Sequence, residues 1–115
     1  MFDFEKLDVY QKVNNLNVKL LKELKENHSI DSFLKDQWKR ASTSILLNLA
    51  EGTGRKTKAD KAHFYVMARG SVFECISILN LLKELEDITP SIHEYFYQEY
   101  EEASKMLTAL KKSLQ

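Results

Sequence analysis

The stretch NLAEGTGRKTKADK, residues 48–61, carries the residue types of a phosphate-binding loop. A loop of that kind follows a β-strand and has the form GxxxxGK(S/T), with the lysine directly after the second glycine. Here Gly52 and Gly54 are two residues apart, Arg55 follows them, and a helical pattern precedes them. The stretch therefore does not predict a nucleotide site. Its glycines predict the C-terminal end of a helix, where a glycine takes the left-handed conformation and lets the chain reverse.

Basic residues gather around this corner. The segment from Lys35 to Arg69 has eight basic and three acidic residues, so it carries +5 in a chain whose net charge is zero. Lys58 and Lys61 lie in the first turn of the next predicted helix, where they oppose the helix dipole, which hints at a bound anion. The candidate phosphate contacts are Lys39, Arg40, Arg55, Lys56, Lys58, Lys61 and Arg69. The alternative is that these side chains form ordinary solvated helix faces.

Three of these cations, Arg55, Lys56 and Lys58, share one corner and are the strongest candidates for phosphate binding. Phosphate contacts position a nucleic acid without reading its sequence. No aromatic residue lies within residues 51–61. We therefore do not expect at this corner the base-stacking platform that is typical of single-strand binders.

The sequence contains little that supports an active site or a metal site. Asp60 and His63 form one Asp-x-x-His, whereas a di-iron bundle needs such a motif from each of two helices and two further carboxylates. The single cysteine, Cys75, lies among apolar residues and is predicted to be a buried, inert thiol. We expect no enzyme activity, no cofactor and no metal.

A second set of polar residues recurs at a spacing of three or four. Ser44, Asn48, Glu51 and Arg55 can form a hydrogen-bonded ladder along one helix face, which Arg40 and Glu74 could join from facing positions. The favoured interpretation of Ser44, Asn48, Glu51 and Glu74 is a polar seam that locks the bundle or a subunit interface.

Periodicity predicts four helices. The first runs over residues 8–26, and the second begins near Asp31 or Ser32 and ends at Gly52 or shortly after. The third begins at Thr57, a capping residue, and continues to about residue 86. The fourth begins at Thr89 and Pro90, a capping residue followed by proline at the first helical position.

Short connections make consecutive helices antiparallel neighbours, so the chain is predicted to be all-α, a single four-helix bundle domain over residues 1–115 with up-down-up-down topology. The third helix is apolar over more than half of its circumference, and the fourth adds Tyr95, Tyr97 and Tyr100 beyond its core stripe. Such a surface predicts a homo-oligomer. The chain has no basic, apolar leader and no long uncharged run, so we expect a cytoplasmic protein without a membrane partner.

Two segments resemble a known family. LKDQWKRASTSILLNLAEGTGR, residues 34–55, and FYVMARGSVFE, residues 64–74, are similar to the bacterial four helix bundle proteins, also called the 23S rRNA intervening-sequence protein family. The matching positions are Leu34, Gln37, Arg40, Ala41, Ser44, Ile45, Asn48, Ala50, Glu51, Gly52, Gly54, Arg55, Gly70, Ser71 and Glu74. Lys39, Leu46, Leu47, Leu49 and Ile76 depart from the pattern, and Ile76 replaces a common second glutamate near Glu74.

The resemblance implies a four-helix bundle that assembles as a ring-like homopentamer. Some family members are encoded within sequences that interrupt 23S rRNA genes, and relatives act as accessory proteins of diversity-generating retroelements that bind nucleic acid and a reverse transcriptase. We therefore expect a non-enzymatic accessory or scaffold that binds RNA or DNA. The alternative is a protein-interaction module, and the two differ in salt response, because phosphate binding weakens steeply with ionic strength.

Overall fold

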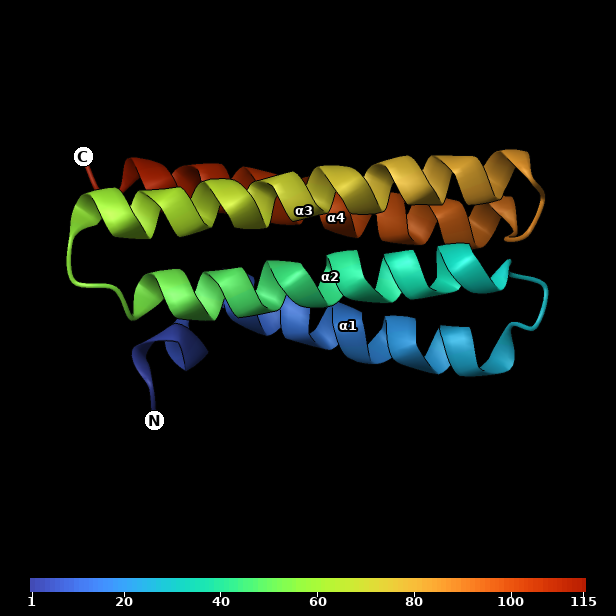
Figure 1. The fold of residues 1–115 in the computed structure, drawn as a ribbon, viewed down its shortest axis with the longest axis horizontal. Coiled ribbons are helices and arrows are strands. Elements are labelled where there is room, and N and C mark those ends of the chain that lie inside the picture. The colour runs from blue at the N-terminus through green and yellow to red at the C-terminus, as the bar shows by residue number, and fades with distance from the viewer.

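Four long helices, preceded by one turn of 3₁₀-helix, run back and forth along the longest axis of the molecule (Figure 1). The computed structural model describes residues 1–115. Its elements are η1 (Asp3–Lys6), α1 (Asp8–Glu26), α2 (Ser32–Thr53), α3 (Lys58–Glu84) and α4 (Pro90–Lys112). The predicted all-α four-helix bundle is confirmed, and it measures 44 × 25 × 21 Å.

Side-chain caps fix where three of the helices begin. The hydroxyl of Thr57 accepts from the backbone N–H of Asp60 at 3.1 Å, and the hydroxyl of Thr89 accepts from Ile92 at the same distance. The carboxylate of Asp31 caps α2 in the same way, accepting from Leu34 at 3.0 Å. Each bond satisfies one of the backbone donors that a helix start leaves free, so the predicted starts are confirmed.

The turn after α2 is built differently from the prediction. No glycine has a positive φ, and Gly54 caps α2 with φ −81° and ψ −8°, in the right-handed region. Gly52 lies inside α2 and is buried. A Cβ at Gly52 would lie 2.6 Å from the Cβ of Phe64 and 3.1 Å from the ring of Tyr65. Gly52 therefore serves the close packing of α2 on α3, not a left-handed helix end.

A hydrogen-bonded chain of polar side chains crosses the core. Indole Nε1 of Trp38 donates to the Tyr100 hydroxyl at 2.8 Å, which lies 2.9 Å from the Ser42 hydroxyl. Ser42 in turn donates to the side-chain oxygen of Asn17, and the amide of Asn17 donates to the Ser42 carbonyl at 3.1 Å. Since Ser42 gives its single proton to Asn17, Tyr100 donates to Ser42. This series of hydrogen bonds joins α1, α2 and α4, and sequence periodicity did not predict it.

The thiol of Cys75 from α3 lies against this polar chain. Burial raises its pKa to about 12. Burial likewise raises the pKa of Tyr100 well above the ordinary tyrosine value. Both groups are therefore neutral at physiological pH, and the predicted burial of Cys75 is confirmed.

We expect Cys75 to resist a thiol-specific alkylating reagent at neutral pH, because the thiolate is the reacting form and the side chain is fully buried. Labelling should proceed only as fast as the protein opens, and should be immediate in denaturant. A Ser77→Cys change in a Cys75→Ala background provides the control, because position 77 is exposed on the same helix. Rapid labelling of Cys75 in the folded protein would contradict the assignment.

Helix α3 is long and apolar enough, by length and composition alone, to span a membrane, and 39% of its most apolar window is buried inside the bundle. The sequence-based expectation had overlooked it because Arg69 and Glu74 interrupt the apolar run. This is weak evidence for a membrane segment, since a core helix passes the same test. Val72, Leu79 and Leu82 of α3 belong to the core of this bundle.

Both chain ends lie at one end of the bundle. Figure 1 shows the N-terminus, the C-terminus and the connection between α2 and α3 together at the left. The 3₁₀ turn η1 packs against both α1 and α2 there. The N-terminal residues are thus brought next to the glycine-containing corner, from which they are about fifty residues away in sequence.

Candidate nucleic-acid interface

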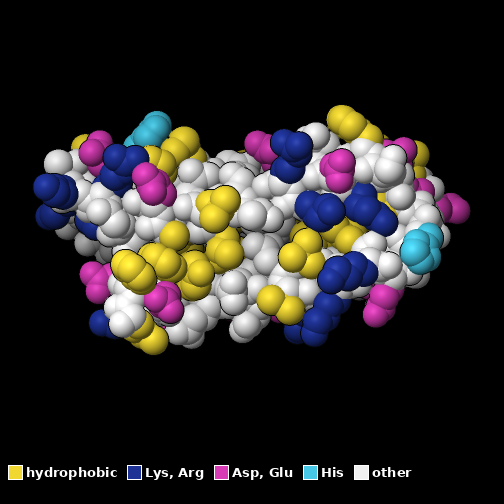
Figure 2. Space-filling model, turned by 60° about the horizontal axis from the view of Figure 1, so that its bottom comes forward, with side chains coloured by type: hydrophobic (Ala, Val, Ile, Leu, Met, Phe, Trp, Pro, Cys, Tyr) yellow, Lys and Arg dark blue, Asp and Glu magenta, His cyan; other side chains and the backbone are white.

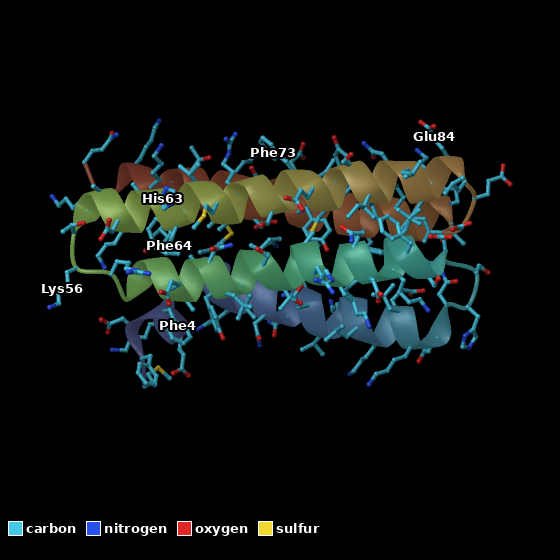
Figure 3. All side chains as sticks on the ribbon, in the orientation of Figure 1. Phe4, Lys56, His63, Phe64, Phe73 and Glu84 are labelled. Atoms are coloured by element: carbon cyan, nitrogen blue, oxygen red, sulfur yellow. The ribbon has the colours of Figure 1, made fainter.

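The corner after α2 holds its arginine in a defined position. The guanidinium of Arg55 donates to Oε1 of Glu51 at 2.7 Å, and its central carbon lies 4.6 Å from the centroid of the Phe64 ring. Figure 3 shows Phe64 between α2 and α3, beside the loop that carries Lys56. The ion pair and the cation–π contact both restrict the rotamers of Arg55, so less entropy is lost when it binds a ligand.

The three lysines at this corner differ in their surroundings. The ammonium of Lys61 donates to the backbone carbonyl of Thr53 at 2.7 Å, which satisfies an acceptor in the last turn of α2. This bond gives Lys61 a structural role that the sequence did not predict. Lys56 and Lys58 are exposed and make no ion pair. Arg55, Lys56 and Lys58 are therefore the cations that the corner presents to solvent, and we call them the basic corner.

The other predicted phosphate contacts lie elsewhere. Lys39 and Arg40 line a shallow hollow on the outer face of α2, together with Thr43, Ser44, Leu47 and Asn48. Arg69 lies over the Phe73 ring at 4.6 Å and lines a separate hollow between α3 and α4 with Lys111. The seven candidates thus occupy three places, and none of Lys39, Arg40 and Arg69 has an acidic partner.

The predicted polar seam forms in pieces. The side-chain amide of Asn48 donates to the backbone carbonyl and the hydroxyl of Ser44, at 2.9 and 3.0 Å. Ser71 of α3 donates to the Ser44 hydroxyl at 3.0 Å, so this part does join two helices. The Glu51–Arg55 pair forms separately, with no bond to Asn48. Glu74 is exposed and has no hydrogen-bond partner. The predicted seam is therefore two separate features. One is a hydrogen-bonded contact between α2 and α3, and the other is a surface ion pair within α2.

An aromatic residue lies at the corner after all. Phe4 of η1 borders a hollow of about 550 Å³ with Leu47, Ala50, Glu51, Gly54 and Arg55. The centroid of its ring lies 4.9 Å from the ring centroid of Tyr10 and 5.9 Å from that of Phe2. In Figure 3, Phe4 lies beside the C-terminal end of α2. No local pattern in the sequence predicts this contact, because tertiary packing of η1 on α2 creates it.

The α1–α2 side of the surface divides into two halves. Figure 2 shows most of the hydrophobic side chains gathered over the half that holds η1, while Lys and Arg side chains lie both at the far end of that half and over the other half. Lys39 belongs to α2. The Asn17–Ser42 contact places that part of α2 beside the second half of α1, which carries Lys19, Lys22 and Lys25. The basic surface of the fold is thus wider than the basic corner alone.

A separate apolar surface lies on α3 and α4. A groove of about 340 Å³ is lined by Val72, Phe73, Ile76 and Tyr97, with Glu101, Ser104 and Lys105 at its border. Phe73 is 53% exposed, which is high for a large apolar side chain. Tyr100, which the sequence analysis had placed on a partner surface, is fully buried and belongs to the polar chain of the core. Tyr95 and Tyr97 do reach the surface.

The sequence profile of the 23S rRNA-intervening sequence proteins matches residues 5–109. The chain belongs to this family. The match contains the four helices almost entirely and every predicted phosphate contact, whereas Phe4 lies just before it. No curated protein matches the chain.

A similar solved structure supports the fold. It is a protein of unknown function from the S23 ribosomal protein family of Bacteroides thetaiotaomicron. The two chains are 25% identical and superpose with a TM-score of 0.85, covering 90% of this chain and 98% of the other. This chain therefore shares the bundle architecture along nearly its whole length.

Proposed function

We propose that this protein is a non-enzymatic, oligomeric accessory protein that binds the phosphate backbone of RNA or DNA through its basic corner. The observation that carries the proposal is the arrangement of Arg55, Lys56 and Lys58. Arg55 is held in place by Glu51 and Phe64, and two exposed lysines without acidic partners follow it within three residues of the chain. A fixed guanidinium with neighbouring ammonium groups suits phosphate oxygens.

Assembly would strengthen such binding. A single corner offers few phosphate contacts, whereas a ring of copies, a homopentamer by resemblance, presents several corners to one nucleic acid. The exposed apolar groove of α3 and α4 supports self-association, because surfaces of that kind usually mark interfaces. A cytoplasmic location, where RNA and DNA are both accessible, is part of the proposal.

The test is a salt series. The purified protein is titrated with labelled structured RNA and with duplex DNA, beside a variant in which Arg55, Lys56 and Lys58 are changed to alanine. The logarithm of the affinity should fall linearly with that of the salt concentration, by about 0.9 per phosphate contact on duplex DNA. The variant should bind more weakly, with a slope shallower by roughly one to three.

A matched variant controls for the loss of charge. Lys25, Lys83 and Lys105 are exposed lysines away from the basic corner, and changing them to alanine removes the same number of positive charges. That variant should keep the parental salt slope. Equal losses in the two variants would mean that only net charge matters. Absence of binding at low salt, in folded and oligomeric protein, would rule out the proposal.

The second candidate function is a protein-interaction module. The α3–α4 groove favours it, because an apolar surface with a tyrosine at its border suits a protein partner. A complex formed there would change little with ionic strength. If the groove holds a different protein and not a further copy of this chain, a Phe73→Ser change would weaken that complex and leave both the oligomer and nucleic-acid binding unchanged.

A further inference from the structure

Two hollows on the outer face of α2 join at one residue. Leu47 borders both the hollow that contains Phe4 and Arg55 and the hollow that contains Lys39 and Arg40. The two hollows are therefore neighbours along α2, on either side of Leu47, and we call them together the α2 groove. Fifteen residues separate Arg40 from Arg55, so the groove spans about 22 Å at the rise of an α-helix.

Charge and apolarity alternate along this groove. Cations lie at its two ends, Lys39 and Arg40 at one and Arg55 at the other. The intervening surface carries Leu47, which is 62% exposed, although core packing does not require an apolar residue there. Phosphate binding alone does not account for an exposed leucine beside an aromatic ring.

The ring of Phe4 is supported from behind. Tyr10 of α1 lies 4.9 Å from it in a tilted arrangement, and Phe4 is half-buried, so its ring is held against the bundle and one part of it borders the groove. Aromatic side chains held in this way are the platforms on which proteins stack unpaired bases, next to cations that contact the neighbouring phosphates.

We propose that the α2 groove binds an unpaired strand of RNA or DNA, with a base stacked on Phe4 and against Leu47 and with phosphates held at Arg55 and at Lys39 and Arg40. The inference rests on the proposed function and narrows it to single-stranded segments. A duplex keeps its bases stacked inside, so it can use the cations but not the Phe4 platform.

A Phe4→Leu variant tests the proposal, because leucine keeps the site apolar but removes the aromatic face. Affinity is measured for single-stranded homopolymers of increasing length and for duplex DNA, and stacking is followed by quenching of 2-aminopurine placed in the strand. The control is Phe73→Leu, since Phe73 is an exposed phenylalanine beside an arginine, Arg69, but lies outside the groove. Thermal unfolding of both variants checks that the bundle is intact.

We expect Phe4→Leu to weaken single-strand binding roughly five- to hundredfold and to abolish the quenching, with duplex affinity unchanged. Phe73→Leu should change neither. If Phe4→Leu leaves single-strand affinity and quenching as they were, while the duplex binds with the usual salt dependence, this inference fails and the proposed function stands. If the parental protein binds neither ligand at low salt, both fail. If Phe4→Leu instead dissociates the oligomer, the groove is a subunit contact and the inference is overturned.

Discussion

Replacing Gly52 with alanine is expected to lower the free energy of unfolding by about 1–3 kcal/mol, although alanine is the better helix former. The new Cβ would lie 2.6 Å from the Cβ of Phe64, and neither atom can move without its backbone. Helices α2 and α3 would have to separate at this point. The strain would reach Tyr65, which hydrogen-bonds to Thr53 at 2.9 Å in the last turn of α2.

Gly54 provides the matched control, two residues away. A Cβ there would meet nothing closer than the Glu51 carbonyl oxygen at 3.6 Å, and its φ of −81° suits any residue. Gly54→Ala should therefore leave stability unchanged or raise it by about 0.4–1 kcal/mol. Urea unfolding followed by circular dichroism measures both variants. Equal effects at the two positions would refute the packing role of Gly52.

The second large effect is expected at Tyr100. Changing it to phenylalanine removes the hydroxyl that accepts from Trp38 and donates to Ser42, and all three side chains are fully buried. The indole N–H of Trp38 would then lack an acceptor. A buried donor left without a partner costs about 1–3 kcal/mol of stability. Tyr97→Phe, on the same helix but partly exposed and free of hydrogen bonds, should cost close to nothing.

A double-mutant cycle separates the hydrogen bond from packing. Trp38→Phe alone leaves a space in the core, and combined with Tyr100→Phe it removes both polar partners. Residues within one hydrogen-bond network couple by about 0.5–3 kcal/mol, so the double variant should lose less stability than the two single losses together. Additive losses would show that the Trp38–Tyr100 bond contributes nothing of its own.

Much of this fold could be predicted from local sequence. The Thr89–Pro90 pair marks the start of α4 because it satisfies a free backbone donor and sets φ, which are local requirements. The apolar period of α1 likewise identifies its buried face, from Val9 to Leu24. Such rules act within one turn of helix, so they hold before any tertiary contact forms.

The glycines show where local rules stop. A glycine near a helix end is usually explained by backbone conformation, and that explanation was wrong for Gly52 because the constraint comes from Phe64 on another helix. Tyr100 was misplaced for a related reason. The prediction left it off the core stripe of α4, although its spacing from Phe96 and Ala103 fits that stripe, and partners from α2 satisfy its hydroxyl in the core.

The candidate site was predictable only in part. The Glu51–Arg55 pair follows from helical spacing and is present. The contribution of Lys61 to the end of α2 and the position of Phe4 both depend on how separate segments pack, so no pattern within residues 51–61 could indicate them. Whether any of these residues binds phosphate remains a prediction that the salt series tests.

The two chain ends lie at the same end of the bundle as the basic corner, which matters for anything attached to them (Figure 1). A flexible extension on either terminus would be tethered near Arg55, Lys56 and Lys58, where short linkers give effective concentrations in the millimolar range. An acidic extension would then act as a built-in competitor of nucleic acid, and a basic one would enlarge the cationic surface. Short appended peptides could in this way set the apparent affinity of the site without touching the bundle.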